Sequence, residues 1–175
     1  MRFTPGHAEQ ADRFRAGTLS EHLDIRFGVD PDGHLTASMP VDARTVQPMG
    51  LLHGGATAAL PETLGSVASA LLVLPEGRQV VGIEVNANHL KGVREGRVTA
   101  TAEALHLGRT THVWEIRVRN AAGELCAVCR LTNVVLPGAP NPPTAGAPPA
   151  PCIRPSASAL TGGSPSPRSA SLAAR

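Results

Sequence analysis

The sequence predicts an α+β fold, an antiparallel sheet with one long helix packed on it. Two observations lead to this prediction. Only residues 56–74 carry apolar residues at helical spacing over several turns, whereas six other segments alternate in the manner of strands. The links between neighbouring strand-like segments are short enough for hairpin turns, which favours antiparallel pairing. The expected order is two strands, the helix and then four strands.

The elements before the long helix are predicted from local patterns. A short amphipathic helix is expected at Ala8–Phe14. Apolar residues then alternate with polar ones over residues 23–29, which predicts a half-buried strand. Asp30-Pro-Asp-Gly33 has the composition of a turn, and the alternation over residues 35–39 predicts the returning strand of a hairpin. The segment Pro40–Leu52 has no periodic pattern and is expected to be irregular.

Residues 56–74 predict a helix with two distinct faces. At 100° per residue, one arc of about 60° holds only apolar residues, namely Leu60, Leu64, Val67 and Leu71. A nearly opposite arc holds Glu62, Ser66 and Ser69. The apolar face is expected in the core, and the other face aligns a carboxylate with two hydroxyls. Pro61 removes one backbone N–H and is expected to disturb the first turns.

Four strand-like runs follow the helix. They are Gln79–His89, Arg97–His106, Arg109–Arg119 and Leu125–Leu136, separated by short glycine-containing turns. A single helix cannot cover both the width and the edges of such a sheet. We therefore expect the chain to dimerise through exposed sheet edges.

The composition changes sharply at Pro137. From there to the end, ten prolines occur in 39 residues, and Ala, Ser and Gly supply most of the rest. Such a segment cannot bury enough apolar surface to offset its ordering entropy. The sequence therefore predicts one domain over residues 1–136 and a disordered segment over residues 137–175.

Charge and composition exclude several classes of function. The chain has 16 Lys+Arg and 14 Asp+Glu, and three arginines lie beyond Pro137, which leaves 13 against 14 in the domain. With only one Trp and three Phe, a nucleic-acid-binding surface is not expected. The polar N-terminus does not resemble a signal peptide, and the apolar run Val67–Leu74 is too short to span a membrane. We expect a cytoplasmic protein without disulfides.

The most informative stretch is Gly50-Leu-Leu-His53-Gly54-Gly55, with Glu62 nine residues after the histidine. The two glycines open the expected helix, so His53 and the N–H groups after it lie at its positive end. Unpaired N–H groups at a helix N-terminus stabilise a negative oxygen. A carboxylate further along the helix can attack, or activate water, beside that oxygen. These groups are the minimum needed to hydrolyse an activated acyl group.

Other catalytic and metal-binding motifs are missing from the sequence. The seven histidines are dispersed, with no pair at His-x-x-x-His spacing. Cys126 and Cys129 would place their thiols on opposite faces of a strand, without a second pair nearby, which disfavours zinc or redox chemistry. P-loop, dinucleotide-binding and Gly-x-Ser-x-Gly patterns do not occur. We therefore expect no metal and no cofactor.

Two segments combine cations with hydroxyl or amide groups. One is the strand end at His89, followed by Lys91 and Arg94, and the other is the turn His106–Thr111. Each segment can be an ordinary hairpin end. Together they would form a basic rim suited to phosphates.

The sequence resembles the hotdog-fold acyl-CoA thioesterases over about residues 20–136. The resemblance rests on separate motifs that occur in order, namely Leu23-Asp-Ile-Arg-Phe27, Met39-Pro-Val-Asp42, Arg44-Thr-Val-Gln47-Pro, Gly50-Leu-Leu-His-Gly-Gly55, Glu62, Val80-Val-Gly-Ile-Glu-Val-Asn-Ala-Asn-His89, Arg94-Glu-Gly-Arg97 and Leu105-His-Leu-Gly108. It is strongest to the bacterial type that acts on aromatic acyl-CoAs. That type includes the 1,4-dihydroxy-2-naphthoyl-CoA hydrolases of menaquinone synthesis and the proofreading thioesterases of enterobactin synthesis.

The resemblance implies a fold and an assembly: a hotdog fold, in which an antiparallel sheet wraps around a long central helix, and dimers with continuous sheets, usually paired into tetramers. It also implies roles for residues. Glu62 would be the nucleophile or general base, the Gly54 N–H would polarise the thioester carbonyl, and Gln47 and His53 would orient the reacting groups. Ser66 would be a hydroxyl near the site across the subunit interface. The positions that match the substrate and CoA groove are Gly82, His89, Leu90, Lys91, Gly92, His106, Leu107, Gly108, Arg109, Thr110 and Thr111.

The predicted function is hydrolysis of an acyl-CoA, with an aromatic acyl group, to the free acid and CoA. Two alternatives remain. A hydratase or dehydratase of the same fold would pair His53 with Glu62 for proton transfer at carbon. A non-catalytic module would bind acyl-CoA without turnover, although a binder has no need of a nucleophile.

Overall fold

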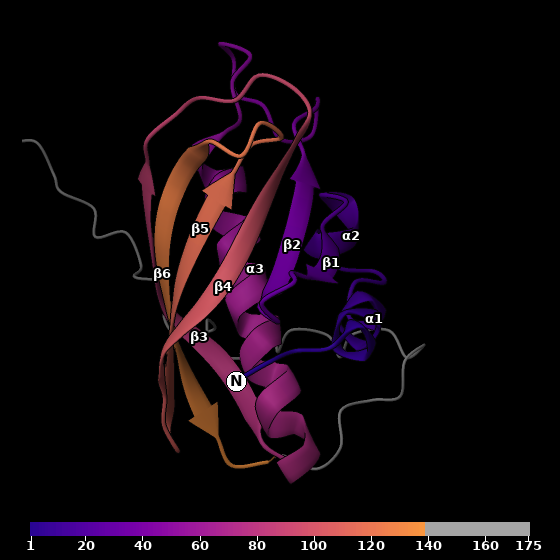
Figure 1. The fold of residues 1–175 in the computed structure, drawn as a ribbon, viewed down its shortest axis with the longest axis vertical. Helices are drawn as coiled ribbons and strands as arrows, with labels where there is room; N and C mark the ends of the chain where they lie inside the picture. The colour runs from indigo at the N-terminus through magenta and orange to yellow at the C-terminus, as the bar shows by residue number, and fades with distance from the viewer. Residues whose placement is uncertain (139–175) are drawn as a thin grey trace, which may run out of the picture. The chain divides into compact units, whose positions relative to one another are not determined.

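The computed structural model describes residues 1–138. The predicted disordered segment, residues 137–175, therefore lies outside the described residues except for its first two positions. Within residues 1–138 the predicted α+β architecture is confirmed (Figure 1).

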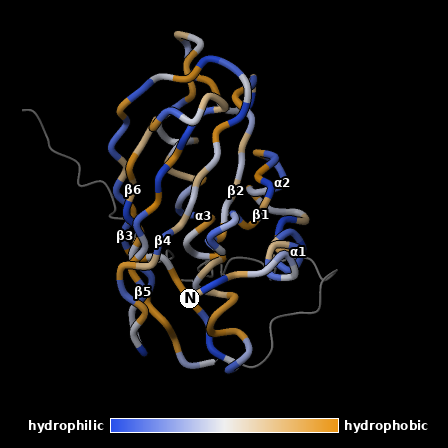
Figure 2. The backbone as a smooth tube through the Cα atoms, in the orientation of Figure 1, coloured by the Kyte–Doolittle hydropathy of each residue, from blue (hydrophilic) through white to orange (hydrophobic). Residues whose placement is uncertain are grey.

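Six strands form one antiparallel sheet in the order β1-β2-β4-β5-β6-β3. The strands are β1 (Arg26–Val29), β2 (Leu35–Pro40), β3 (Gln79–His89), β4 (Arg97–Leu107), β5 (Thr111–Arg119) and β6 (Leu125–Leu136). The last four agree with the predicted runs to within two residues at each end. On β5 and β6, buried positions alternate with more exposed ones over most of each strand, so that one face is turned to the core. Figure 2 shows the hydropathy of each residue along the backbone.

The long helix α3 (Gly54–Val73) lies along one face of the sheet and continues into a short 3-10 turn, η1 (Leu74–Glu76) (Figure 1). It contacts five strands, β2 to β6, so one helix serves nearly the whole sheet. Gly65 permits the closest approach, because a Cβ there would lie 2.5 Å from Leu131 Cδ2 on β6. Pro61 lies buried within this helix, which runs unbroken past it.

The two predicted faces of α3 are only partly confirmed. Leu60, Leu64 and Leu71 are buried in the core as expected. Ser69, however, is fully buried and accepts a hydrogen bond from the Trp114 indole N–H at 2.8 Å. The prediction that Ser69 shares an open polar face with Glu62 is therefore wrong. The sheet reaches around enough of the helix to bury part of its polar arc as well.

The N-terminal part departs from prediction in two places. The first helix, α1, spans Pro5–Arg13, and a second short helix, α2 (Leu19–His22), was not predicted. The strand expected over residues 23–29 starts only at Arg26. The reason is Asp24, whose φ of 49° places it in the left-handed region, so that an extended run cannot pass through it.

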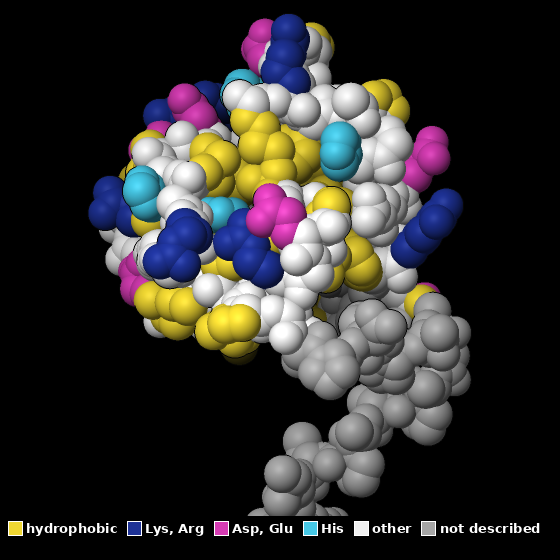
Figure 3. Space-filling model, turned by 90° about the horizontal axis from the view of Figure 1, so that it is seen from below, with side chains coloured by type: hydrophobic (Ala, Val, Ile, Leu, Met, Phe, Trp, Pro, Cys, Tyr) yellow, Lys and Arg dark blue, Asp and Glu magenta, His cyan; other side chains and the backbone are white. Residues whose placement is uncertain are grey.

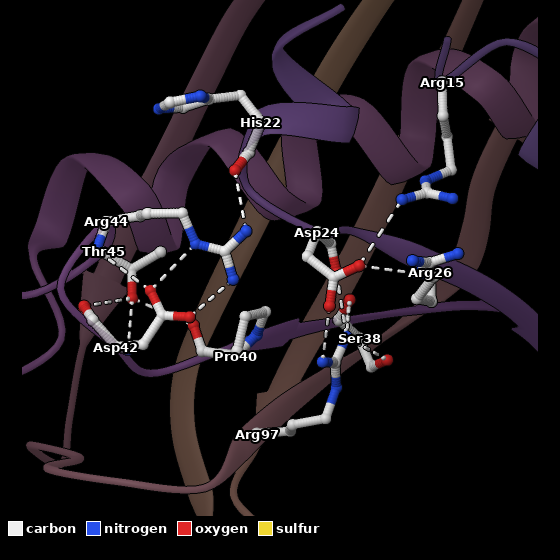
Figure 4. A network of polar contacts seen from close by, with 10 residues as sticks. All are labelled: Arg15, His22, Asp24, Arg26, Ser38, Pro40, Asp42, Arg44, Thr45 and Arg97. Atoms are coloured by element: carbon white, nitrogen blue, oxygen red, sulfur yellow. Dashed lines mark hydrogen bonds and ion pairs between the residues drawn. The ribbon is translucent and has the colours of Figure 1, made fainter.

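A network of ion pairs holds this irregular part against the sheet (Figure 4). The Asp24 carboxylate accepts from Arg97 at 3.0 Å and from Arg26 at 2.7 Å, and Arg15 approaches it to 3.5 Å. Arg97 comes from β4, so the contact joins the N-terminal turn to the middle of the sheet. Hydrogen bonds from Arg97, then from Arg26, hold the pKa of the Asp24 carboxyl below its ordinary value.

A second cluster supports the segment that leads to α3. Arg44 pairs with the Asp42 carboxylate and donates to the His22 carbonyl at 3.0 Å (Figure 4). Hydrogen bonds from Arg44 lower the pKa of Asp42 to about 2. The Thr45 hydroxyl is buried and donates to the Pro40 carbonyl at 2.9 Å. These contacts hold residues 42–45 in place just before the segment Gln47–His53.

The two edges of the sheet are β1 and β3. β3 is an eleven-residue strand with most of its residues exposed, including the apolar side chains of Val81, Ile83 and Val85. A long edge strand with exposed apolar residues is a template for pairing with another strand.

The segment Gly54–Glu76 is long and apolar enough to cross a membrane by length and composition alone. Half of its most apolar window is buried against the rest of the domain, and a core helix meets the same test. Its packing on five strands identifies it as the core helix.

We predict that Gly65→Ala destabilises the protein by about 1–2 kcal/mol. Overpacking against Leu131 costs about 1–3 kcal/mol, and the better helix propensity of alanine recovers at most about 1 kcal/mol. Urea unfolding measures the change. The matched control is Gly6→Ala in α1, where the nearest atom to an added Cβ is 3.8 Å away. Equal stability of the two variants would contradict the close packing of α3 on β6.

We also predict that Asp24→Asn weakens the protein only where Asp24 is ionised. A depressed folded-state pKa gives stability that is fully present above the ordinary value of 3.8 and lost as the pH falls through the folded value. The advantage of the wild type in unfolding free energy should therefore be constant from about pH 7 to 5 and shrink below about pH 4. Asparagine tolerates the left-handed conformation, so the backbone is not disturbed. A difference in unfolding free energy between wild type and variant that stays the same from about pH 7 to about pH 3 would contradict this prediction.

Candidate active site

The loop before α3 is shaped by its own backbone hydrogen bonds. The Gln47 N–H donates to the Leu51 carbonyl at 2.8 Å, and the Gly50 N–H donates to the Gln47 carbonyl at 2.9 Å. Gly50 has a φ of 73°, which favours glycine. The Gln47 side-chain oxygen accepts from the Met49 N–H. The His53 N–H donates to the backbone carbonyl of the buried Thr45 at 2.8 Å, and this bond holds His53 at the start of the helix.

His53 is the N-cap of α3. Its Nδ1 accepts from the Gly55 N–H at 2.8 Å, so the proton of the neutral ring lies on Nε2. The Gly54 N–H has no acceptor among residues 1–138. A Cβ at Gly54 would stand 3.1 Å from His89 Nε2, so the His89 ring lies directly against the start of the helix. The expected free N–H group at the positive end of α3 is present.

A pocket of about 350 Å³ opens beside this helix start. Its lining residues are Gln47, Leu51, Leu52, Gly54, Thr57, His89, Leu90, Lys91, Gly92, Val93 and Cys126. The pocket thus unites Gln47 and Gly54 with the predicted groove residues His89 to Gly92. Its walls are largely aliphatic, and His89 is the polar side chain that lies against Gly54.

The Glu62 carboxylate lies elsewhere on the helix and is half-buried. Its Oε1 accepts from the Ser66 hydroxyl at 3.3 Å, and a Cβ on Gly82 would lie 3.2 Å from it. Gly82 is therefore the place where β3 leaves room for the carboxylate. Asn133 on β6 completes the surroundings, with its Oδ1 3.4 Å from the Ser66 hydroxyl.

Within one chain, Glu62 and Gly54 are too far apart to act on one carbonyl. Glu62 comes eight positions after Gly54, which corresponds to a rise of about 12 Å along α3. The carboxylate is also turned toward Ser66, one turn further from Gly54, and Glu62 does not line the pocket. The Glu62 carboxylate therefore does not lie beside the helix start of its own chain.

The predicted groove segment His106–Thr111 lies at the other end of the sheet. His89 pairs with Ala127 on β6, whereas Thr111 pairs with Val134, and seven strand residues span about 23 Å. The two basic segments therefore do not form a single rim within one chain. A separate cavity of about 420 Å³ lies at this end, lined in part by Arg78, Arg109 and Thr110.

Figure 3 looks onto this end, where Lys or Arg and His side chains gather beside an exposed apolar patch. Arg78 donates to the Arg109 carbonyl at 2.9 Å and pairs with Glu76. His112 is buried behind the turn, and burial, with the charge of Arg78, lowers its pKa. This end is therefore basic, and its cations are only partly neutralised.

Sequence reasoning missed the buried polar residue Asn133 and the pocket walls from Leu51, Val93 and Cys126. Asn133 occupies an inward position of β6 between Leu131 and Val135, and an amide in an apolar row was the available clue. No pattern distinguishes the wall residues from other core residues.

The cysteines and the one possible cation cluster add no further chemistry. Cys126 and Cys129 are both buried, and burial raises the pKa of the Cys129 thiol to about 11. Among residues 1–138, only Asp30, Asp32 and His34 bring three potential metal ligands together. Asp30 there accepts from the His34 backbone N–H at 2.8 Å, and its other oxygen lies 3.0 Å from the His34 ring Nδ1.

Known proteins that resemble this chain in sequence and fold include several thioesterases. A sequence model of the Thioesterase superfamily matches residues 49–127. The 1,4-dihydroxy-2-naphthoyl-CoA hydrolase of Escherichia coli K12 is 50% identical over 121 residues, 69% of this chain and 88% of that protein. The proofreading thioesterase EntH of Klebsiella pneumoniae is 51% identical over 119 residues, 68% of this chain and 86% of that protein. A crystal structure of a mutant of thioesterase PA1618 from Pseudomonas aeruginosa superposes with a TM-score of 0.71 at 53% identity, covering 74% of this chain and 94% of that one.

The six-stranded antiparallel sheet around one long helix is the hotdog fold, as predicted. The chain belongs to the thioesterase superfamily. The prediction of a thioester hydrolase is confirmed at the level of this enzyme class.

Proposed function

We propose that the protein hydrolyses a compact, aromatic acyl-CoA to the free acid and CoA. The proposal rests above all on the pocket that joins the free Gly54 N–H to Gln47 and His89. A carbonyl oxygen pointing at that N–H meets a hydrogen-bond donor and the positive end of α3 together. Both favour the negative oxygen that forms when a thioester is attacked, and one such donor contributes about 10²–10³ in rate.

Glu62 is the proposed attacking or water-activating group. The carboxylate either adds to the thioester carbon, giving a mixed anhydride and CoA thiolate, or removes a proton from an attacking water. Both routes release CoA as a good leaving group and need no strong acid. His53 and Gln47 are proposed to orient the carbonyl and the attacking oxygen.

The working site is proposed to combine Gly54 of one chain with the Glu62 carboxylate of a second. In each chain Gly54 stands at the level of His89, and Glu62 stands at the level of Gly82. Antiparallel pairing of β3 with the same strand of a second copy, centred between Val85 and Asn86, sets the partner subunit's Gly82 opposite His89. That arrangement carries the partner's carboxylate to the pocket and covers the exposed edge strand.

The same pairing brings the two basic segments together. Because the partner's β3 runs in the opposite direction, its Gln79 end lies beside the His89 end of the first chain. The partner's Arg109 and Thr110 then come to the side of the pocket that Lys91 occupies. Phosphates of CoA would bind to these cations and hydroxyls. Dimers would then pair into tetramers, as the resemblance implies.

The size of the pocket supports a compact acyl group. About 350 Å³ lies at the low end of the range for small-molecule sites, and its aliphatic walls suit a ring more than a long flexible chain. The E. coli relative is a 1,4-dihydroxy-2-naphthoyl-CoA hydrolase. We propose a substrate of that kind or a benzoyl-type thioester, consistent with menaquinone biosynthesis in the cytoplasm.

Thiol release from benzoyl-CoA, 1,4-dihydroxy-2-naphthoyl-CoA, hexanoyl-CoA and palmitoyl-CoA tests this function. We expect the aromatic thioesters to give the highest kcat/KM and palmitoyl-CoA the lowest. Glu62→Gln should lower kcat by about 10³-fold, because an amide can neither attack nor accept the proton. Glu103→Gln, at an exposed acid on β4, is the matched control and should keep full activity.

Three results would contradict the proposal. Normal hydrolysis by Glu62→Gln would remove that residue from the mechanism. Tight binding of acyl-CoA without turnover by the wild type would favour a binding module. Hydration of an enoyl-CoA without thiol release would favour a hydratase.

Subunit mixing tests the shared site separately. Gln47→Ala damages the pocket side and Glu62→Gln the carboxylate side, so each variant alone should be nearly inactive. After subunit exchange, half of the dimers are mixed and each has one intact site of two, so activity should return to about a quarter of wild type. Formation of mixed dimers, shown with two different tags, without recovery of activity would place the whole site within one chain.

A further inference from the structure

A buried polar network lies directly beneath the Glu62 carboxylate. Asn133 is fully buried on β6, and its amide nitrogen donates to the Gly65 carbonyl at 3.1 Å and to the Ser69 hydroxyl at 2.9 Å. Ser69, also fully buried, accepts a second hydrogen bond from the Trp114 indole at 2.8 Å. The network thus ties α3 to β5 and β6 at one level of the helix.

These contacts determine the orientation of the Asn133 amide. Its two N–H groups are both used, and a flipped amide would turn its oxygen against the Gly65 carbonyl, where neither group has a proton to give. The Oδ1 atom must therefore face away from Gly65. It points at the Ser66 hydroxyl, 3.4 Å away.

The Ser66 hydroxyl stands between two acceptors. Glu62 Oε1 lies 3.3 Å from it on one side and Asn133 Oδ1 lies 3.4 Å from it on the other. A hydroxyl has one proton, and both distances exceed the usual length of an O–H···O bond. Asn133 therefore keeps the hydroxyl in a shared position, where it does not bind Glu62 at full strength.

We propose that Asn133 is a positioning residue for Glu62 and acts through the Ser66 hydroxyl. The amide, held by Gly65 and Ser69, sets where the hydroxyl stands, and the hydroxyl sets the direction of the carboxylate. Both groups border the space that a side chain at Gly82 would fill. Glu62 Oε1 lies 3.2 Å and Asn133 Oδ1 lies 3.6 Å from the position of a Cβ at Gly82. The catalytic consequence rests on the proposed function of Glu62.

A double-mutant cycle on thiol release tests this route. Asn133→Leu keeps the size of the side chain and removes the amide, and we expect it to lower kcat about tenfold with KM unchanged, since the pocket at Gly54 is not touched. In the Ser66→Ala background the same substitution should change kcat by less than about twofold, because the route is already broken. Ser69→Ala, which frees the amide without removing it, should give a smaller loss that also vanishes in that background.

The matched control is Trp114→Phe. It removes the indole donor at the far end of the network and costs stability, but leaves both amide hydrogen bonds of Asn133 and the shared hydroxyl intact. It should therefore keep a kcat near that of wild type. Circular dichroism and urea unfolding verify that each variant is folded.

A second readout requires no turnover. In protein carrying ¹³C-labelled glutamate carboxyl groups, the resonance of Glu62 is identified by its loss in Glu62→Gln. We expect this resonance to move in Asn133→Leu and in Ser66→Ala, with no further movement when the first substitution is added to the second. Ser69→Ala gives the same test with a milder change should the leucine variant fail to fold.

The outcomes are distinct. A loss of kcat that persists unchanged in the Ser66→Ala background overturns the positioning role. A Glu62 carboxyl resonance that does not move in Asn133→Leu overturns it as well. An equal loss in Trp114→Phe also overturns it, since instability alone would then explain the effect. A wild type that releases no thiol from any substrate refutes the proposed function, while a Glu62 resonance that still depends on Asn133 through Ser66 upholds the network.

Discussion

The close approach of α3 to β6 at Gly65 is the constraint on which the rest of the structure depends. Only a residue without a side chain lets the helix axis come near enough for Leu131 to pack against its backbone. That proximity brings the Gly65 carbonyl within reach of the Asn133 amide. It also sets Glu62, one turn earlier, against β3, where Gly82 again leaves out a side chain. Two glycines on facing elements thus define the space in which the carboxylate lies.

A rigid helix also explains why Gly54 and Glu62 of one chain cannot meet at one carbonyl. The positive end of α3 acts only over its first turn, so the group that benefits from it must bind at Gly54. Glu62 lies beyond that turn, where the helix dipole has little effect on a carboxylate and the core is near enough to hold it. A helix cannot shorten to bring the two together. In the proposed dimer, antiparallel pairing of two copies would solve this geometry, because it would reverse the order of the two groups along the shared sheet.

Local patterns in the sequence determine most of the fold but little of this arrangement. The runs Gln79–His89 and Leu125–Leu136 are rich in residues that favour strands and lie between turn residues, and they form strands with those bounds. The early strand was predicted too long because nothing in the residue types shows that Asp24 takes a positive φ. The burial of Ser69 was missed for a related reason. A helical wheel assigns faces but not how far a sheet curves around them.

The parts of the site that depend on neighbouring residues were predicted, whereas the parts that depend on residues far apart in the chain were not. The two glycines that open α3, with His53 at its positive end, follow from the sequence at short range, and the structure has both features. The separation of His89 from Thr111 depends on strand register, which pairs His89 with Ala127 and Thr111 with Val134, residues far apart in the chain. Asn133 depends on it too, since its partners on α3 lie more than sixty residues away.

An amide in an apolar core is costly unless each of its groups is paired, and Asn133 meets that condition only in part. Both of its N–H groups have full partners, whereas its oxygen shares one hydroxyl proton with Glu62. If the amide served packing alone, an aliphatic side chain would fill the same volume without this unequal pairing. The underused atom, Asn133 Oδ1, faces the same Ser66 hydroxyl that contacts the Glu62 carboxylate. The Glu62 carboxylate therefore lies beside a hydroxyl whose proton it shares with Asn133, so that the hydroxyl contacts the carboxylate without binding it at full strength.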